Sequence, residues 1–219
     1  MRVKTKLGIA ASLLLVGSIH AAVVDYNWSG VFANGTAVPD NNTNGWADSR
    51  NLSGLNGTVS GLAVTLDLTG GWNGDLYAYV QHGSGFTVLL NRVGVSEAHP
   101  SGNAGEGVLV TFSAAGTPDL HTYLGNGTGV LTGTWQPDGA GFNSFLGLNP
   151  NGDWRLFLAD LNGADMMTVN SWGLHLELSA VPEPSEWAAM SFGLLGLAWV
   201  VKRIGRRLKA KVKPMPIRN

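Results

Sequence analysis

The feature that most constrains this chain is a repeated alternation of apolar and polar residues, interrupted by Gly-rich turns. Residues 62–68 (LAVTLDL), 107–113 (GVLVTFS), 154–160 (WRLFLAD) and 171–178 (SWGLHLEL) all show it. A period of two is the side-chain period of a β-strand. The 31 glycines and the Asn-Gly, Gly-Gly and Asp-Gly pairs between these stretches are typical of tight turns. The pattern predicts an all-β fold, an antiparallel β-sandwich or jelly roll.

One set of alternating positions is expected to form the core. Its members are Leu62, Val64, Leu66, Leu68, Val108, Val110, Phe112, Trp154, Leu156, Leu158, Trp172, Leu174, Leu176 and Leu178. The chain has no cysteine, so this core must stabilise the fold without disulfides.

Charge is segregated along the 219 residues. Arg2, Lys4 and Lys6 lie at the start, and eight basic residues fall between 202 and 218. Residues 23–181 hold three Arg against thirteen Asp and Glu, a net charge of −10. A body this acidic argues against nucleic acid as a partner, and basic ends point to membrane topology.

Residues 1–22 have the anatomy of a secretory signal peptide. A basic start is followed by the apolar stretch 7–16 and by the small residues Ala21 and Ala22. We expect export through the Sec translocon, cleavage by signal peptidase and a mature domain from residue 23 to 180.

The C-terminal region combines a VPEP motif (181–184), an apolar segment (187–201), a basic cluster (202–207) and a basic tail (208–219). Basic residues favour the cytoplasmic side, so the tail is expected to stay inside the cell. This order resembles the PEP-CTERM sorting signal of Gram-negative bacteria. The residues that carry the resemblance are Val181, Pro182, Glu183, Pro184, Lys202, Arg203, Arg206 and Arg207.

That resemblance implies one short C-terminal transmembrane helix and transient anchoring in the inner membrane. An exosortase would then cut near the motif and release the body to the cell surface or the medium. The apolar segment is short against the roughly 20 residues of a full span. The alternative is a simple C-terminal anchor, with Pro182 and Pro184 as a rigid spacer.

Residues 149–178 (NPNGDWRLFLADLNGADMMTVNSWGLHLEL) and 38–80 resemble the P domain, or Homo B domain, of subtilisin-like proprotein convertases. The resemblance implies a β jelly roll with Trp154 and Trp172 in its core. In that family the domain is an accessory of a neighbouring protease, so no activity of its own is implied.

Metal binding is suggested by acidic residues near Asn and Gly. Asp153, Asp160 and Asp165 lie close in sequence, and Asp75 falls at the family's Gly-Asp-Leu element. Calcium prefers such oxygen ligands. The alternative is that these residues cap turns between strands.

Three tryptophans in turn-like segments, Trp46, Trp72 and Trp135, are candidates for an aromatic platform that binds carbohydrate. The alternative is that they close the ends of the sandwich. His82 and Ser84 are close in sequence, but no GxSxG segment supports a serine hydrolase.

The sequence therefore predicts an exported, non-enzymatic surface or matrix protein, structural or adhesive among exopolysaccharides or other surface proteins. Its alternatives are a carbohydrate-binding module and a free-standing accessory domain of a separate protease. Calcium is the one candidate cofactor.

Overall fold

The computed structural model describes residues 21–118, 120–125, 128–179, 196, 199–203 and 206. Within these residues the body is built from ten strands and three short 3₁₀ helices. The strands are β1 (Ala22–Ser29), β2 (Ala37–Val38), β3 (Trp46–Leu52), β4 (Thr58–Gly70), β5 (Leu76–His82), β6 (Gly85–Asn91), β7 (Gly107–Thr117), β8 (Leu131–Trp135), β9 (Gly152–Asp160) and β10 (Met167–Ser179). The 3₁₀ helices are η1 (Asn73–Asp75), η2 (Leu120–Thr122) and η3 (Asn143–Phe145).

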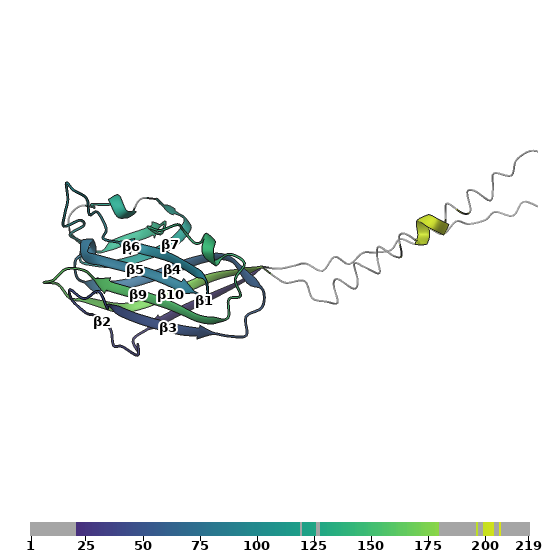
Figure 1. Cartoon of the computed structure of the whole chain (residues 1–219), viewed down its shortest axis with the longest axis horizontal. Helices are drawn as coiled ribbons and strands as arrows, with labels where there is room; N and C mark the ends of the chain where they lie inside the picture. The colour runs from purple at the N-terminus through teal and green to yellow at the C-terminus, as the bar shows by residue number, and fades with distance from the viewer. Residues whose placement is uncertain are drawn as a thin grey trace, which may run out of the picture. The chain divides into compact units, whose positions relative to one another are not determined.

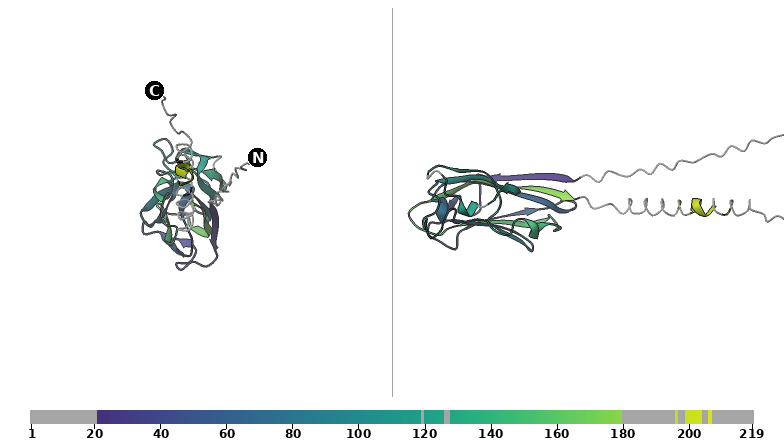
Figure 2. Two further views of the ribbon diagram at one scale, coloured as in Figure 1. Left: turned by 90° about the vertical axis from the view of Figure 1, so that its right-hand side faces the viewer. Right: turned by 90° about the horizontal axis from the view of Figure 1, so that it is seen from above.

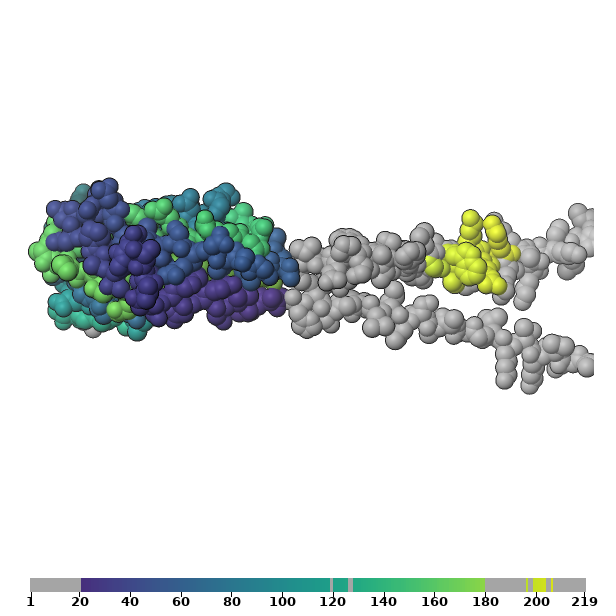
Figure 3. Space-filling view, turned by 90° about the horizontal axis from the view of Figure 1, so that it is seen from below, coloured from purple at the N-terminus to yellow at the C-terminus, as the bar shows by residue number. Residues whose placement is uncertain are grey.

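The strands form two sheets that pack face to face (Figure 1). Sheet A has the order β1-β10-β4-β7-β8, with β2 pairing to β10, and sheet B has the order β3-β9-β5-β6. The right-hand view of Figure 2 shows the strands from above, and the space-filling view in Figure 3 shows purple residues from the start of the body on the surface seen from below. The predicted all-β sandwich is confirmed.

One strand departs from the antiparallel prediction. β8 runs parallel to β7, with Val108 opposite Leu131 and Phe112 opposite Trp135. Parallel neighbours need a long connection, and residues 118–130 supply it between these two strands.

The core includes every residue that the alternation predicted, together with residues from other strands and loops such as Leu76, Leu89 and Phe145. All fourteen predicted residues are buried, and Trp154 and Trp172 are among the largest side chains that are fully enclosed. In β10 an irregularity in register between Val169 and Ser171 shifts the alternation by one residue, so both Val169 and Trp172 point inward. Such a bulge lets one long strand keep its apolar side chains on the core.

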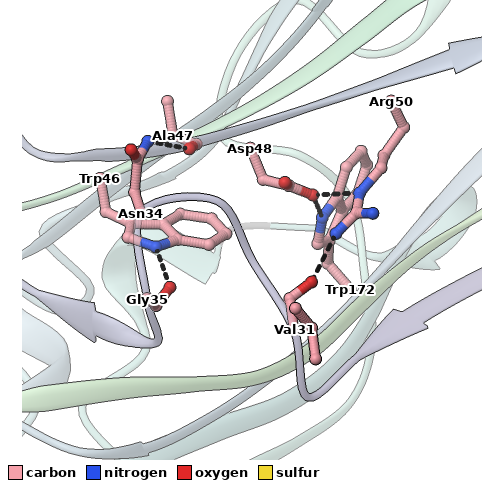
Figure 4. A network of polar contacts seen from close by, with 8 residues as sticks. All are labelled: Val31, Asn34, Gly35, Trp46, Ala47, Asp48, Arg50 and Trp172. Atoms are coloured by element: carbon pink, nitrogen blue, oxygen red, sulfur yellow. Dashed lines mark hydrogen bonds and ion pairs between the residues drawn. The ribbon is translucent and has the colours of Figure 1, made fainter.

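A polar network joins the two sheets at the β3 edge (Figure 4). The carboxylate of Asp48, on β3, accepts hydrogen bonds from Trp172 Nε1 at 2.7 Å and from Arg50 Nε at 2.6 Å. Arg50 also donates to the backbone oxygen of Val31 at 3.3 Å. Asp48 is buried, so these donors compensate its charge inside the sandwich.

Contacts divide the chain into the body, His20–Val181, and a second unit of residues 1–19 and 182–219. The described residues of the second unit, 196, 199–203 and 206, are helical, and the Arg203 guanidinium lies 4.9 Å from the centre of the Trp199 ring. No helix among the described residues is long and apolar enough to cross a membrane.

Most residues of the predicted export and sorting signals lie outside the described residues. These are residues 1–20 of the signal peptide, the VPEP motif at 181–184, most of the apolar segment 187–201, and Arg207. Lys202, Arg203 and Arg206 are described as helical.

Candidate binding surface on the four-stranded sheet

Three of the predicted metal ligands meet at one end of the sandwich. Asp75 ends η1, Asp160 ends β9, and Asp165 lies in the loop from β9 to β10. Asp40, which follows β2, joins them, and its Oδ2 accepts a hydrogen bond from the Ala164 N–H at 3.3 Å. The fold thus gathers carboxylates from four separate segments.

Burial raises the pKa of the Asp75 and Asp160 carboxyls above the usual value of 3.8. Hydrogen bonds from Asn162 to each carboxylate, and the positive charge of Arg92 near Asp75, lower the two pKa values by less. Repulsion from Asp40 and Asp165 adds to the increase. The acidic end therefore holds negative charge that its hydrogen bonds do not fully compensate.

Asp153, the fourth predicted ligand, lies elsewhere. It is near the start of β9 and accepts a hydrogen bond from Asn51 Nδ2 at 2.7 Å, whereas Asp160 ends the same strand. Seven residues of extended chain separate the two by roughly 23 Å. Among the described residues, no group of three or more His, Cys, Asp or Glu side chains is arranged to hold a metal ion. Calcium binding stays a prediction.

The three predicted tryptophans occupy three different places. Trp46 is buried in the core, only 2% exposed, and its Nε1 donates to the Gly35 oxygen at 2.8 Å. It therefore offers no exposed face for stacking, because the start of β3 turns this side chain toward the inside of the sandwich.

Trp72 and Trp135 are half-buried, and they lie in different places: Trp72 directly precedes η1, and Trp135 ends β8. The Trp72 Nε1 donates to the Ser101 oxygen at 2.6 Å, and the Trp135 Nε1 donates to the Thr132 oxygen at 3.0 Å. Both indole N–H groups are thus used within the protein. Their assignment as carbohydrate ligands stays a prediction.

His82 is engaged in the core and not with Ser84. Its two ring nitrogens lie 2.9 Å and 2.7 Å from the backbone oxygens of Asp153 and Asn149. The ring stacks on Trp154 with centroids 4.1 Å apart. Both nitrogens are therefore occupied by backbone groups, which leaves neither for a serine hydroxyl.

A hollow of about 170 Å³ lies beside β8, lined by Asn103, Tyr123, Leu131 and glycine backbone. Pockets for small ligands usually measure 300–1,000 Å³. The hollow is therefore smaller than a usual pocket for a small ligand.

The outer face of sheet B is unusually apolar. Its strand register aligns Ala47, Phe157, Tyr79 and Val88 in one row across four strands. Tyr77 and Phe86 extend the row on either side along β5 and β6. We call these six residues the aromatic face.

The rings of the aromatic face pack against one another. The Tyr79 ring stacks on the Phe157 ring with centroids 4.8 Å apart and planes 16° apart. It also contacts Phe86 at 5.1 Å and Tyr77 at 6.3 Å. Phe86 remains 45% exposed, while the two tyrosines and Phe157 are half-buried. Cross-strand aromatic pairs of this kind stabilise a sheet by roughly 0.2–1 kcal/mol each.

The outer face of sheet A has the opposite character. Asn170 Nδ2 donates to the Asp67 carboxylate at 2.9 Å, and His175 pairs with Asp25 at 2.6 Å across β10 and β1. Leu109 on β7, 55% exposed, is one of few large apolar side chains there. The two faces of one sandwich therefore meet solvent very differently.

Sequence reasoning missed the aromatic face, although a signal was present. In DLYAYVQ (75–81) and GFTVLL (85–90) apolar residues occupy both sets of alternating positions. Strands that are apolar on both faces are typical of sheets covered on both sides. The signal is weak in each strand and becomes clear only when the register places the rings together.

No protein-family model matches this chain, and no curated protein matches its sequence. Two solved structures of an Aeromonas sobria serine protease are similar to it in fold. The structure of the protease with the chaperone ORF2 is 14% identical with a TM-score of 0.45, covering 74% of this chain and 28% of that chain. The structure of the serine protease of Aeromonas sobria is also 14% identical with a TM-score of 0.45, covering 73% and 27%. The chain thus spans little more than a quarter of the chains it resembles.

Proposed function

We propose that this chain is an exported, non-enzymatic module that binds another protein through the aromatic face of sheet B. The observation that supports the proposal is the apolar row Ala47, Phe157, Tyr79 and Val88 on a surface that faces away from the core. An antiparallel sheet that meets only water normally alternates apolar and polar residues. Contiguous exposed apolar patches on soluble proteins mark interaction sites.

The geometry of the rings favours a protein over a polysaccharide. The Tyr79 ring stacks on Phe157 and meets Phe86 at a tilt of 43°, so these two neighbours cover part of its surface. Sugar rings stack on exposed aromatic faces, whereas protein interfaces are enriched in Tyr, Phe and Arg packed edge-on or face-on against apolar groups. The resemblance to P domains, which accompany a protease, agrees with a protein partner.

The export route belongs to the same proposal. The signal peptide at 1–22 delivers the body across the inner membrane, and the PEP-CTERM-like region at 181–207 retains it there until an exosortase acts. The released module then works at the cell surface or in the extracellular matrix. Structural adhesion among exopolysaccharides follows if the partner is itself a matrix protein.

A site-specific photo-crosslinker tests the binding face. Benzoylphenylalanine replaces Phe86 in the full chain expressed in its own bacterium, and Leu109 on sheet A serves as the control position because its exposure is similar, 55% against 45%. We expect one or a few discrete protein adducts from position 86 and none from position 109. Adding Tyr79→Lys should remove the adducts, because a buried ammonium opposes docking.

Two results would contradict the proposal. Equal crosslinking from the two positions would show nonspecific contact. Adducts that periodate or glycosidase treatment removes would favour the carbohydrate-binding alternative instead.

The sorting half of the proposal is tested separately by the intact mass of the protein from membrane, surface and medium fractions. We expect the extracellular form to lack residues after the region 181–184. An intact C-terminus found only in membranes would instead indicate a permanently tethered domain.

A further inference from the structure

The body has three basic residues besides histidine, and one of them stands apart. Arg50 pairs with Asp48 at 2.6 Å, and Arg92 lies 3.8 Å from a carboxylate oxygen of Asp75. Arg155 has no carboxylate within ion-pair distance among the described residues. In a body with a net charge of −10, a cation that forms no ion pair is unexpected.

Arg155 lies in the middle of the outer face of sheet B. It sits on the central strand β9, between Ser49 on β3 and Gln81 on β5. Phe157, two residues along the same strand, belongs to the aromatic face, so the guanidinium borders the apolar row. Arg155 itself is exposed.

The acidic residue nearest to it along β9 is already engaged. Asp153 points to the same side of the strand, and its carboxylate accepts the hydrogen bond from Asn51. Two residues of strand separate Asp153 from Arg155 by roughly 7 Å. The guanidinium donors therefore remain available to a molecule that docks on this face.

We infer that Arg155 selects the partner: the docking surface of the bound protein carries an Asp or Glu carboxylate beside an apolar patch. This inference rests on the proposed function, because it names the chemistry of the partner at the same surface. A guanidinium binds a carboxylate through two parallel hydrogen bonds, which fixes orientation as well as charge. Phe157, two residues along β9, borders the pair on one side, where a docked partner would shield it from water.

The acidity of the rest of the body gives this pair its selectivity. A partner with an exposed carboxylate is repelled by most of the surface and attracted at Arg155. Charge complementarity of this kind fixes the register of docking and suppresses wrong contacts more than it adds affinity.

Selection from a random peptide display library against the full chain tests the inference. We expect the enriched peptides to combine aromatic or aliphatic residues with at least one Asp or Glu. Their affinity for Arg155→Gln should fall by roughly tenfold or more, and Arg155→Lys should recover only part of the loss because an ammonium lacks the planar fork. Selection against Arg155→Glu should enrich Lys and Arg instead.

Tyr79→Lys separates the two levels of the proposal. Peptides that lose binding to Tyr79→Lys but bind Arg155→Gln as well as wild type would overturn the role of Arg155 while leaving the binding face intact. Peptides that bind Tyr79→Lys unchanged, or a library that yields no binders, would count against the face itself. Because Arg155 is exposed, its variants are expected to keep the circular dichroism and melting curve of the wild type.

Discussion

On sheet A the outward positions of β4 and β10 hold the polar residues Thr65, Asp67, His175 and Glu177. On sheet B those of β5 and β9 hold Tyr77, Tyr79 and Phe157, beside the polar residues Gln81, Asp153 and Arg155. The polar side chains of sheet A pair with one another across strands, as in Asp25 with His175. The aromatic side chains of sheet B pair with one another too, but they leave apolar surface toward solvent. Both patterns stabilise a sheet, but the second places a cluster of aromatic rings against water, whereas sheet A exposes single apolar side chains such as Leu109 and Val23.

The difference indicates that the outer face of sheet B carries apolar residues that folding alone does not require. Either sheet would fold with polar residues on its outer face and apolar residues on its inner face. Sheet A follows this rule, and sheet B resembles a strand layer that is covered on both faces. A partner that covers the aromatic face supplies the missing layer.

The largest expected effect on stability comes from removing Asp48, whose hydrogen bonds join the two sheets. Asp48→Ala leaves the Arg50 guanidinium and the Trp172 indole N–H without their shared acceptor. We expect the free energy of unfolding to fall by about 3–5 kcal/mol in urea denaturation. Asp25→Ala, which removes an exposed pair on sheet A, should cost at most about 1 kcal/mol. A similar loss of unfolding free energy in both variants would contradict a buried, stabilising role for Asp48.

Calcium is the next test, directed at the acidic end between the two sheets. An ion that binds among Asp75, Asp160 and Asp165 would relieve their repulsion, and at a hundred times its Kd it would stabilise the fold by about 2.7 kcal/mol. We expect the melting temperature to rise with calcium and fall with chelator, and Asp160→Asn to lose this response. Asp153→Asn, at the other end of β9, is the matched control. A melting temperature that changes with neither calcium nor chelator would rule out calcium binding at the acidic end.

The contrast between the two faces can be measured directly by dye binding. Phe86→Lys removes the most exposed ring of the aromatic face, and Leu109→Lys removes a residue of sheet A whose exposure is similar, 55% against 45%. We expect the fluorescence of the apolar dye ANS to fall by about half in Phe86→Lys and to change little in Leu109→Lys. The reverse order would mean that sheet B is not the apolar face in solution.

Stability should depend on pH through Asp75 and Asp160. Burial raises the pKa of each carboxyl above 3.8, so the folded state holds more protons than the unfolded chain at pH values between the unfolded and folded pKa. Their stabilising contribution is complete below the unfolded pKa and is lost as the pH rises through the folded pKa. Asp160→Asn should therefore be more stable than wild type at neutral pH and show a weaker pH slope in acid. A steeper slope in the variant would contradict the direction of the shift.

The smallest effect concerns Tyr77 on the aromatic face. Burial raises the pKa of its hydroxyl above 10.0, and the neighbouring Tyr79 adds to the increase. Its contribution to stability is complete below about pH 10 and is lost as the pH rises through the folded pKa. A difference titration of wild type against Tyr77→Phe, followed by ultraviolet absorbance, should locate the ionisation of Tyr77. Tyr79→Phe should lower the pKa of Tyr77. A partner bound on the aromatic face should raise the pKa of Tyr77 further, because it buries the hydroxyl more deeply.

Four strands, β4, β7, β9 and β10, and the core residues on them could be predicted from the sequence, since the period of two is a local property. Each of Leu62, Leu66, Trp154 and Trp172 is buried because its neighbours in sequence turn it inward, whatever the partner strand. The same local signal could not show that β8 runs parallel to β7, because the direction of a neighbour depends on the connection and not on the strand.

The sites were decided by the tertiary structure. Asp153 and Asp160 are near in sequence, but an extended strand holds them at opposite ends, while Asp40 reaches the acidic end from a distant segment. Trp46 lies in a turn-like sequence, but the start of β3 directs it into the core. The aromatic face needs β9, β5 and β6 in one register before Phe157, Tyr79 and Phe86 become neighbours. Alternation along a strand is fixed by bonds between adjacent residues, whereas a binding surface is fixed by which strands lie side by side, and that is a property of the packed sheet alone.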